Sequence, residues 1–173
     1  GSEMCIRDRM YTVGDISVKS KKLINVTYES LNRAIKILKP GKRIGDIGHE
    51  IQSFVEKNGF SVVRDFCGHG IGTNFHQEPN ILHYGSKDTG DELKPGMTFT
   101  IEPMINAGKY HTKVLNDGWT AVTKDKTLSA QFEHTVGITE NGYEIFTESA
   151  KDYKEPPYLS LIHISEPTRQ SPI

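Results

Sequence analysis

Two amphipathic segments, followed by a series of short alternating segments, restrict the fold of this chain more than any other feature. Apolar residues at helical spacing predict a helix over Lys21–Lys39, ended by Pro40-Gly41, and a second helix over Ile44–Lys57. Four later segments have strand character: Phe60–Val63, Gly96–Pro103, Ser129–Thr139 and Tyr143–Phe146. Helices followed by antiparallel-looking strands predict an α+β fold.

Composition and charge exclude several classes of protein. The 173 residues are 25% charged and 35% apolar, which is typical of a globular domain. The formal net charge of −1 argues against a protein that binds DNA by neutralising phosphates, so no DNA partner is expected. No apolar run reaches the ~18 residues that span a bilayer, so no membrane association is expected.

The two ends of the chain are predicted not to be native protein. One DNA segment, read from opposite strands, encodes both Gly1–Asp8 and Leu159–Pro167, and it resembles a transposase adaptor from sequencing-library preparation. We therefore expect residues 1–9 and 159–173 to be adaptor-derived and residues 10–158 to be native. Cys67 is then a lone native thiol, which suits a reducing compartment.

Three segments carry residue types suited to catalysis. His69 lies between two glycines, whose missing Cβ atoms would leave room for a metal or substrate, and His76 and His83 follow. Glu102 and Glu133 each interrupt a strand-like pattern, where an unpaired buried carboxylate would be costly. One imidazole and two carboxylates suit Zn²⁺, Mn²⁺, Fe²⁺ or Co²⁺ and a site that activates water.

Each segment also has an ordinary structural interpretation. The glycines could mark turns beside solvated histidines. Thr100 and Glu102 could share the solvent face of a strand, as polar residues of antiparallel strands commonly do. Glu133 and His134 could form a surface pair. Taken singly, no segment decides between these interpretations and a metal site.

Taken together, the segments resemble type I methionine aminopeptidases. The likeness runs from about Met10 to Tyr143 and is carried by Phe66–Tyr84, Leu93–Pro103, Leu128–Thr135 and the Trp119 region. It implies a pita-bread fold, truncated here at its N-terminal half, with two divalent cations (Co, Mn, Fe or Zn). It also implies removal of the N-terminal methionine from nascent polypeptides by a cytoplasmic monomer, with the ribosome as a partner.

The resemblance also assigns roles to individual residues. It implies three metal ligands (His69, Glu102, Glu133), a general base (Glu102), a catalytic histidine that contacts the scissile peptide (His76) and a methionine pocket (Cys67, Phe75, Trp119). The family's two aspartate ligands lie upstream, and Ile6 occupies the position of the second one. With three of five ligands, this chain is expected to be inactive as it stands.

Two alternative functions remain open at the level of sequence. A non-catalytic pita-bread binding protein would keep the fold and lose the metal. A prolidase-like peptidase would share the ligand types and cleave Xaa-Pro bonds, and assays on Met peptides and Xaa-Pro peptides would separate it from a methionine aminopeptidase.

Overall fold

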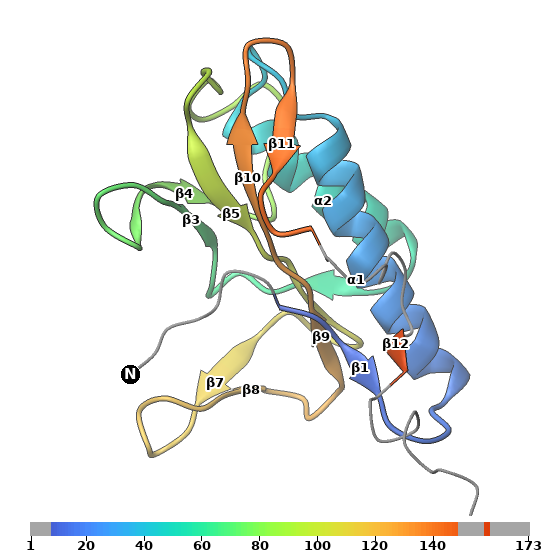
Figure 1. Ribbon diagram of the computed structural model, residues 1–173. Helices are drawn as coiled ribbons and strands as arrows, with labels where there is room; N and C mark the ends of the chain where they lie inside the picture. The colour runs from blue at the N-terminus through green and yellow to red at the C-terminus, as the bar shows by residue number, and fades with distance from the viewer. Residues whose placement is uncertain (1–7, 149–157, 160–173) are drawn as a thin grey trace, which may run out of the picture.

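The computed structural model describes residues 8–148 and 158–159 (Figure 1). Two helices, α1 (Val18–Lys36) and α2 (Ile44–Lys57), lie against one another on one side of the strands. The strands are β1 (Tyr11–Thr12), β2 (Ser61–Val62), β3 (Gly68–Gly70), β4 (Gln77–Ile81), β5 (Thr98–Ile101), β6 (Met104–Asn106), β7 (Thr112–Val114), β8 (Ala121–Thr123), β9 (Ser129–Gln131), β10 (His134–Ile138), β11 (Tyr143–Ile145) and β12 (Tyr158–Leu159). No helix in the described ranges is long and apolar enough to cross a lipid bilayer.

The helix boundaries follow from local capping. The Oγ atom of Ser17 accepts a hydrogen bond from the Ser20 amide at 3.1 Å, so α1 begins at Val18, three residues before the predicted start. The predicted bounds of α2 are confirmed. At its N-terminus the Asp46 carboxylate accepts a hydrogen bond from the Arg43 amide at 2.9 Å, which satisfies a backbone donor that the helix itself leaves unpaired.

The strands form two main sheets. A five-stranded antiparallel sheet has the order β11-β10-β5-β3-β4, and a three-stranded antiparallel sheet has the order β2-β6-β9. Strands β7 and β8 form a separate hairpin, and β1 pairs in parallel with β12. Strand β12 includes Leu159, at the edge of the segment expected to be adaptor-derived.

The two sheets are joined where two neighbouring chain segments pass from one sheet into the other. Strand β5 continues through Glu102-Pro103 into β6, and β9 continues through Phe132-Glu133 into β10. Strand β5 pairs with β10 in the first sheet, and β6 pairs with β9 in the second. The prediction of one continuous strand over Ser129–Thr139 is therefore wrong. Apolar and polar residues still alternate in the sequence across this break, but burial does not, since Phe132 and Glu133 are both 2% exposed.

One hydrophobic core holds the helices against the sheets. Helix α1 contacts β5, β6 and β9, and α2 contacts β2 and β4. The fully buried side chains of this core include Leu31 and Ile35 from α1, Ile47 and Ile51 from α2, and Phe99 from β5. Burial of several large side chains at about 1.5–3 kcal/mol each fixes the helices to the sheets, and so fixes the position of the junction between the sheets.

Candidate active site

The glycines on either side of His69 allow its strand to fit between two neighbours. An added Cβ at Gly68 would lie 2.3 Å from the Thr100 carbonyl oxygen of β5, and one at Gly70 would lie 2.3 Å from the Glu78 carbonyl oxygen of β4. The expectation that these glycines leave open space beside the imidazole is therefore wrong. They let β5 and β4 close around β3, and this close fit sets where His69 stands.

The His69 side chain presents one ring nitrogen to the junction. Its Nδ1 lies 3.0 Å from the Gly70 carbonyl oxygen, and because a carbonyl can only accept, Nδ1 carries the proton in this contact. Nε2 then keeps its lone pair and lies 3.8 Å from Glu102 Oε1. A fixed proton on one nitrogen and a free lone pair on the other is the state in which histidine binds a metal.

Glu102 and Glu133 lie next to each other at the junction of the two sheets. Because His134 pairs with Ile101 in antiparallel register, the next position along brings Glu133 opposite Glu102. Glu102 and Glu133 lie between the regular strands, and the backbone amide of each donates to a group that is not a carbonyl of the paired strand. The Glu102 N–H donates to His83 Nε2 at 3.0 Å, and the Glu133 N–H donates to the Asp8 carbonyl oxygen at 3.0 Å.

Three side chains hold Glu102, and the sequence did not single them out for this role. The Thr100 hydroxyl hydrogen-bonds Glu102 Oε1 at 2.7 Å, and Gln131 Nε2 lies 3.4 Å from Oε2. Thr100 is fully buried, so the interpretation that Thr100 and Glu102 share a solvent face is wrong. His83 is 2% exposed, and burial lowers its pKa to about 3, so its neutral ring can accept the Glu102 amide.

The environment of Glu133 fits a bound cation. Its side chain is 2% exposed, and its Oε2 atom has no hydrogen-bond partner among the described residues. Burial, followed by the neighbouring Glu102 and Asp8 carboxylates, raises the pKa of Glu133 to about 8. Burial also raises the pKa of Glu102. A divalent cation would remove the cost of burying these facing carboxylates, because they are hard oxygen ligands.

The structure brings the predicted ligands to one place without closing them into a binding cluster. Within residues 8–148 and 158–159, no group of three His, Cys, Asp or Glu side chains is arranged to hold a metal ion. The assignment of His69, Glu102 and Glu133 as ligands therefore stays a prediction. Their residue types and the unsatisfied Glu133 oxygen agree with it.

Aromatic rings and one thiol line the region beside His69. The rings of His69 and His76 are 4.2 Å apart between centroids, and Phe75 lies 5.4 Å from His69 and 4.7 Å from His76. Cys67 Sγ lies 3.7 Å from Asn80 Oδ1, and burial, with the Glu102 carboxylate as a smaller contribution, raises the pKa of the thiol. Cys67, Phe75 and His76 thus lie on the same side of the sheet junction as His69.

The third residue predicted for the methionine pocket lies elsewhere. Trp119 is in the loop between β7 and β8 and is 86% exposed, and its amide donates to Asp117 Oδ1 at 3.0 Å. Among the described residues, no hydrogen bond or ring contact joins it to Cys67 or Phe75. Its place in that pocket stays a prediction.

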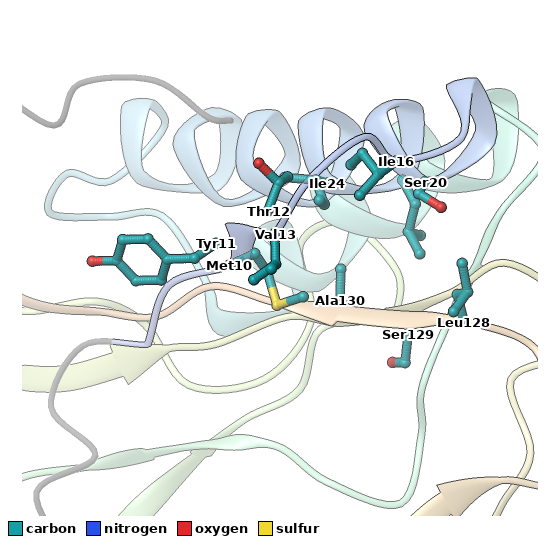
Figure 2. A pocket seen from close by; sticks show the side chains of 11 residues that line it. Met10, Tyr11, Thr12, Val13, Ile16, Ser20, Ile24, Leu128, Ser129 and Ala130 are labelled. Carbon is teal, nitrogen blue, oxygen red and sulfur yellow. The ribbon is translucent and has the colours of Figure 1, made fainter. Parts of the chain in front are cut away.

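A separate apolar pocket of about 280 Å³ lies between the N-terminal strand, α1 and β9 (Figure 2). Met10, Ile24 and Ala130 line it together with the exposed side chain of Leu128. None of the predicted ligands or catalytic residues lines this pocket. It is therefore distinct from the junction of the sheets.

The shifted groups predict a pH dependence of stability in metal-free buffer. His83 has a folded pKa of about 3 against an ordinary 6.5, so the unfolded chain binds the extra proton and stability falls as pH drops through that window. Glu133 has a folded pKa of about 8 against 4.5, so stability falls as pH rises through that window.

We expect the free energy of unfolding to fall by about 1 kcal/mol between pH 6.5 and 8, because the loss at Glu133 exceeds the smaller gain as His83 of the unfolded chain finishes losing its proton. Urea denaturation at a series of pH values, with a chelator present, measures this change. Glu133→Gln should flatten most of the alkaline fall, whereas Glu144→Gln, on the exposed edge strand β11, should leave it unchanged. An alkaline fall that persists undiminished in Glu133→Gln would show that other groups cause it.

Comparison with known proteins agrees with the arrangement of helices and sheets described above. The profile of metallopeptidase family M24 matches residues 7–140. The methionine aminopeptidase of Rickettsia prowazekii is 57% identical over 151 residues, which cover 87% of this chain and 58% of the relative. The methionine aminopeptidase of Escherichia coli is 55% identical over 139 residues, which cover 80% of this chain and 53% of the relative.

Solved structures show the same relationship. The crystal structure of the Rickettsia prowazekii enzyme aligns with a TM-score of 0.80 over 82% of this chain and 58% of that one, at 57% identity. The prolidase from Pyrococcus furiosus aligns with a TM-score of 0.59 over 81% of this chain and 36% of that one, at 26% identity.

These likenesses define the architecture as part of a pita-bread fold, which confirms the predicted fold class. The chain belongs to metallopeptidase family M24. It spans little more than half the length of the methionine aminopeptidases it matches. A metallopeptidase family implies divalent cations, in agreement with the donor set at the junction of the sheets.

Proposed function

We propose that residues 10–158 are the C-terminal part of the catalytic domain of a methionine aminopeptidase, and that residues 1–9 and 159–173 are adaptor-derived. The complete enzyme would remove the N-terminal methionine of nascent polypeptides in the cytoplasm, as a monomer acting at the ribosome. The observation that carries this proposal is the pair of facing glutamates at the sheet junction, one of them with a buried oxygen that has no described partner, beside the free Nε2 of His69.

His69, Glu102 and Glu133 would hold two divalent cations of the Co, Mn, Fe or Zn type, together with two aspartates absent from this chain. When bound, the cations would polarise the scissile carbonyl and lower the pKa of a water molecule. Glu102 serves as the general base. Its Oε1 accepts a short hydrogen bond from the Thr100 hydroxyl and its Oε2 a longer one from Gln131 Nε2, and the more weakly held Oε2 is the oxygen we assign to accept a proton from water.

Residues beside the junction would bind and orient the substrate. His76 is placed next to His69 and contacts the scissile peptide through its imidazole. Cys67, Phe75 and Trp119 bind the methionine side chain and shield it from water, since a thioether is best bound by apolar and aromatic walls. Phe75 contacts both histidine rings, so the pocket and the reacting groups share one wall.

A chimera tests this function. The N-terminal half of a relative, such as the Rickettsia prowazekii methionine aminopeptidase, is joined before Met10 and assayed with Co²⁺ or Mn²⁺ on Met-Ala-Ser and on an Xaa-Pro peptide. We expect turnover of Met-Ala-Ser alone. Turnover of the Xaa-Pro peptide alone would make the protein prolidase-like. A folded, metal-loaded chimera that cleaves neither peptide would be a non-catalytic binding protein.

A substitution in the pocket gives a second test, again in the chimera. Phe75→Ala should reduce discrimination between Met and Ala at the substrate N-terminus by about 10–200-fold, because one apolar wall is worth roughly 1–3 kcal/mol. The measurement is kcat/KM for peptides beginning with Met, Leu and Ala. Phe66→Ala, at a 37% exposed ring outside the histidine cluster, is the matched control. Equal discrimination in both variants would remove Phe75 from the pocket.

A further inference from the structure

One hydroxyl connects two of the predicted ligands. Thr100 Oγ1 lies 3.0 Å from the His69 amide nitrogen and 2.7 Å from Glu102 Oε1. We propose that Thr100 is a positioning residue, which fixes His69 and Glu102 relative to one another through this single hydroxyl. The inference rests on the proposed function for the roles of these two residues, but the contacts stand independently of it.

The chemistry of the donors fixes the direction of both hydrogen bonds. A backbone N–H can only donate, so Thr100 Oγ1 must accept from His69. The one hydroxyl proton is then directed to Glu102 Oε1. Thr100 is fully buried, so no bulk water competes for either contact. The carboxylate of Glu102 and the backbone of His69 are thereby held in one arrangement.

The path of strand β3 explains why a side chain takes this role. Gly70 pairs with Phe99, and the Ile71 amide donates to the Thr98 carbonyl at 2.9 Å. In a regular antiparallel ladder the His69 amide would donate to the Thr100 carbonyl. It donates to the Thr100 hydroxyl instead, at the point where the pairing of β3 with β4 changes register between His69 and Gly70. The irregular backbone at His69 therefore depends on a hydroxyl at position 100.

Two substitutions of Thr100 distinguish the effect of its hydroxyl group from the effect of its side-chain shape. Thr100→Val keeps the branched shape and removes both hydrogen bonds, while Thr100→Ser keeps the hydroxyl. Thr98→Val is the matched control, because Thr98 lies two residues earlier on the same strand and its side chain has no hydrogen bond to a described residue. Partners that orient metal ligands typically contribute about 10–100-fold to metal affinity or activity.

Hydrogen-exchange NMR on the 173-residue chain tests the contact itself. In the wild type we expect a protected His69 amide and a slowly exchanging Thr100 hydroxyl proton with a nuclear Overhauser effect to that amide. Thr100→Val should accelerate exchange of the His69 amide by at least about fivefold, as expected when a hydrogen bond worth about 1 kcal/mol is lost. Thr100→Ser and Thr98→Val should not. An unprotected His69 amide in the wild type overturns the proposal without any variant.

Kinetics of the chimera test the positioning role. Thr100→Val should lower kcat by about 10–100-fold with KM for Met-Ala-Ser little changed, and Thr100→Ser should restore most of the loss. A Thr100→Val chimera with wild-type kcat and metal affinity would overturn this inference and leave the proposed function intact. A wild-type chimera that is inactive on every peptide would refute the proposed function, while the NMR measurement would still decide the hydroxyl contact.

Discussion

The 173-residue chain should release no methionine from Met-Ala-Ser at any Co²⁺ or Mn²⁺ concentration, whereas the chimera with a restored N-terminal half should turn over. Two carboxylates and a neutral imidazole would supply only two negative charges for the two dications that we propose, without the two aspartates expected in the N-terminal half of the complete enzyme. Metal affinity should be at least about 100-fold below that of the chimera, since loss of a partner that merely orients a ligand already costs about 10–100-fold.

Isothermal titration with Co²⁺, run beside the peptide assay, checks both parts of this expectation. Asp8 is the residue to control, because its carboxylate contributes to the raised pKa of both Glu102 and Glu133 and it occupies a segment expected to be adaptor-derived. Metal-dependent turnover by the chain itself that persists in Asp8→Asn would show that three ligands suffice. Loss of the turnover in Asp8→Asn would assign the missing charge to Asp8.

The spacing of apolar residues in the sequence predicted where the helices lie better than it predicted how the strands pair into two sheets. Helix α2 has the predicted bounds because its apolar spacing and its flanking residues agree. Helix α1 begins three residues early because Ser17 caps it one turn before the predicted start at Lys21. The junction of the two sheets was not predictable from the sequence pattern, because apolar and polar residues keep alternating through Phe132-Glu133 although both side chains are buried there.

For the candidate site, the sequence identified the candidate ligands but not the residues that position them. The sequence singled out His69, Glu102 and Glu133, and the structure brings them to one junction. The residues that hold Glu102 were not recognised, because Thr100 and Gln131 differ from ordinary polar strand residues only in being buried or aimed at the carboxylate. Their one sequence signal is weak: a hydroxyl two residues before a glutamate lies on the same face of a strand.

The proposed roles of Glu102 and Glu133 can be distinguished, because substitution of each residue should change a different measured quantity. In the chimera, Glu133→Ala should lower the metal content, since it removes the buried oxygen that has no described hydrogen-bond partner. Measurement of bound metal by mass spectrometry after desalting gives this result directly. Full metal occupancy in Glu133→Ala would exclude Glu133 as a metal ligand.

Glu102→Gln should lower kcat by about 10²–10⁴-fold, and by a larger factor than it raises KM, because a general base acts only in the transition state. The Gln side chain still offers an oxygen to the Thr100 hydroxyl, so the hydrogen bond that positions residue 102 can persist while the basic oxygen is lost. Glu144→Gln, on the exposed edge of β11, controls for the removal of one negative charge. The measurement is steady-state kinetics on Met-Ala-Ser at saturating Co²⁺. A Glu102→Gln enzyme with kcat close to that of Glu144→Gln would mean that water is deprotonated elsewhere and that Glu102 serves the site only as a ligand.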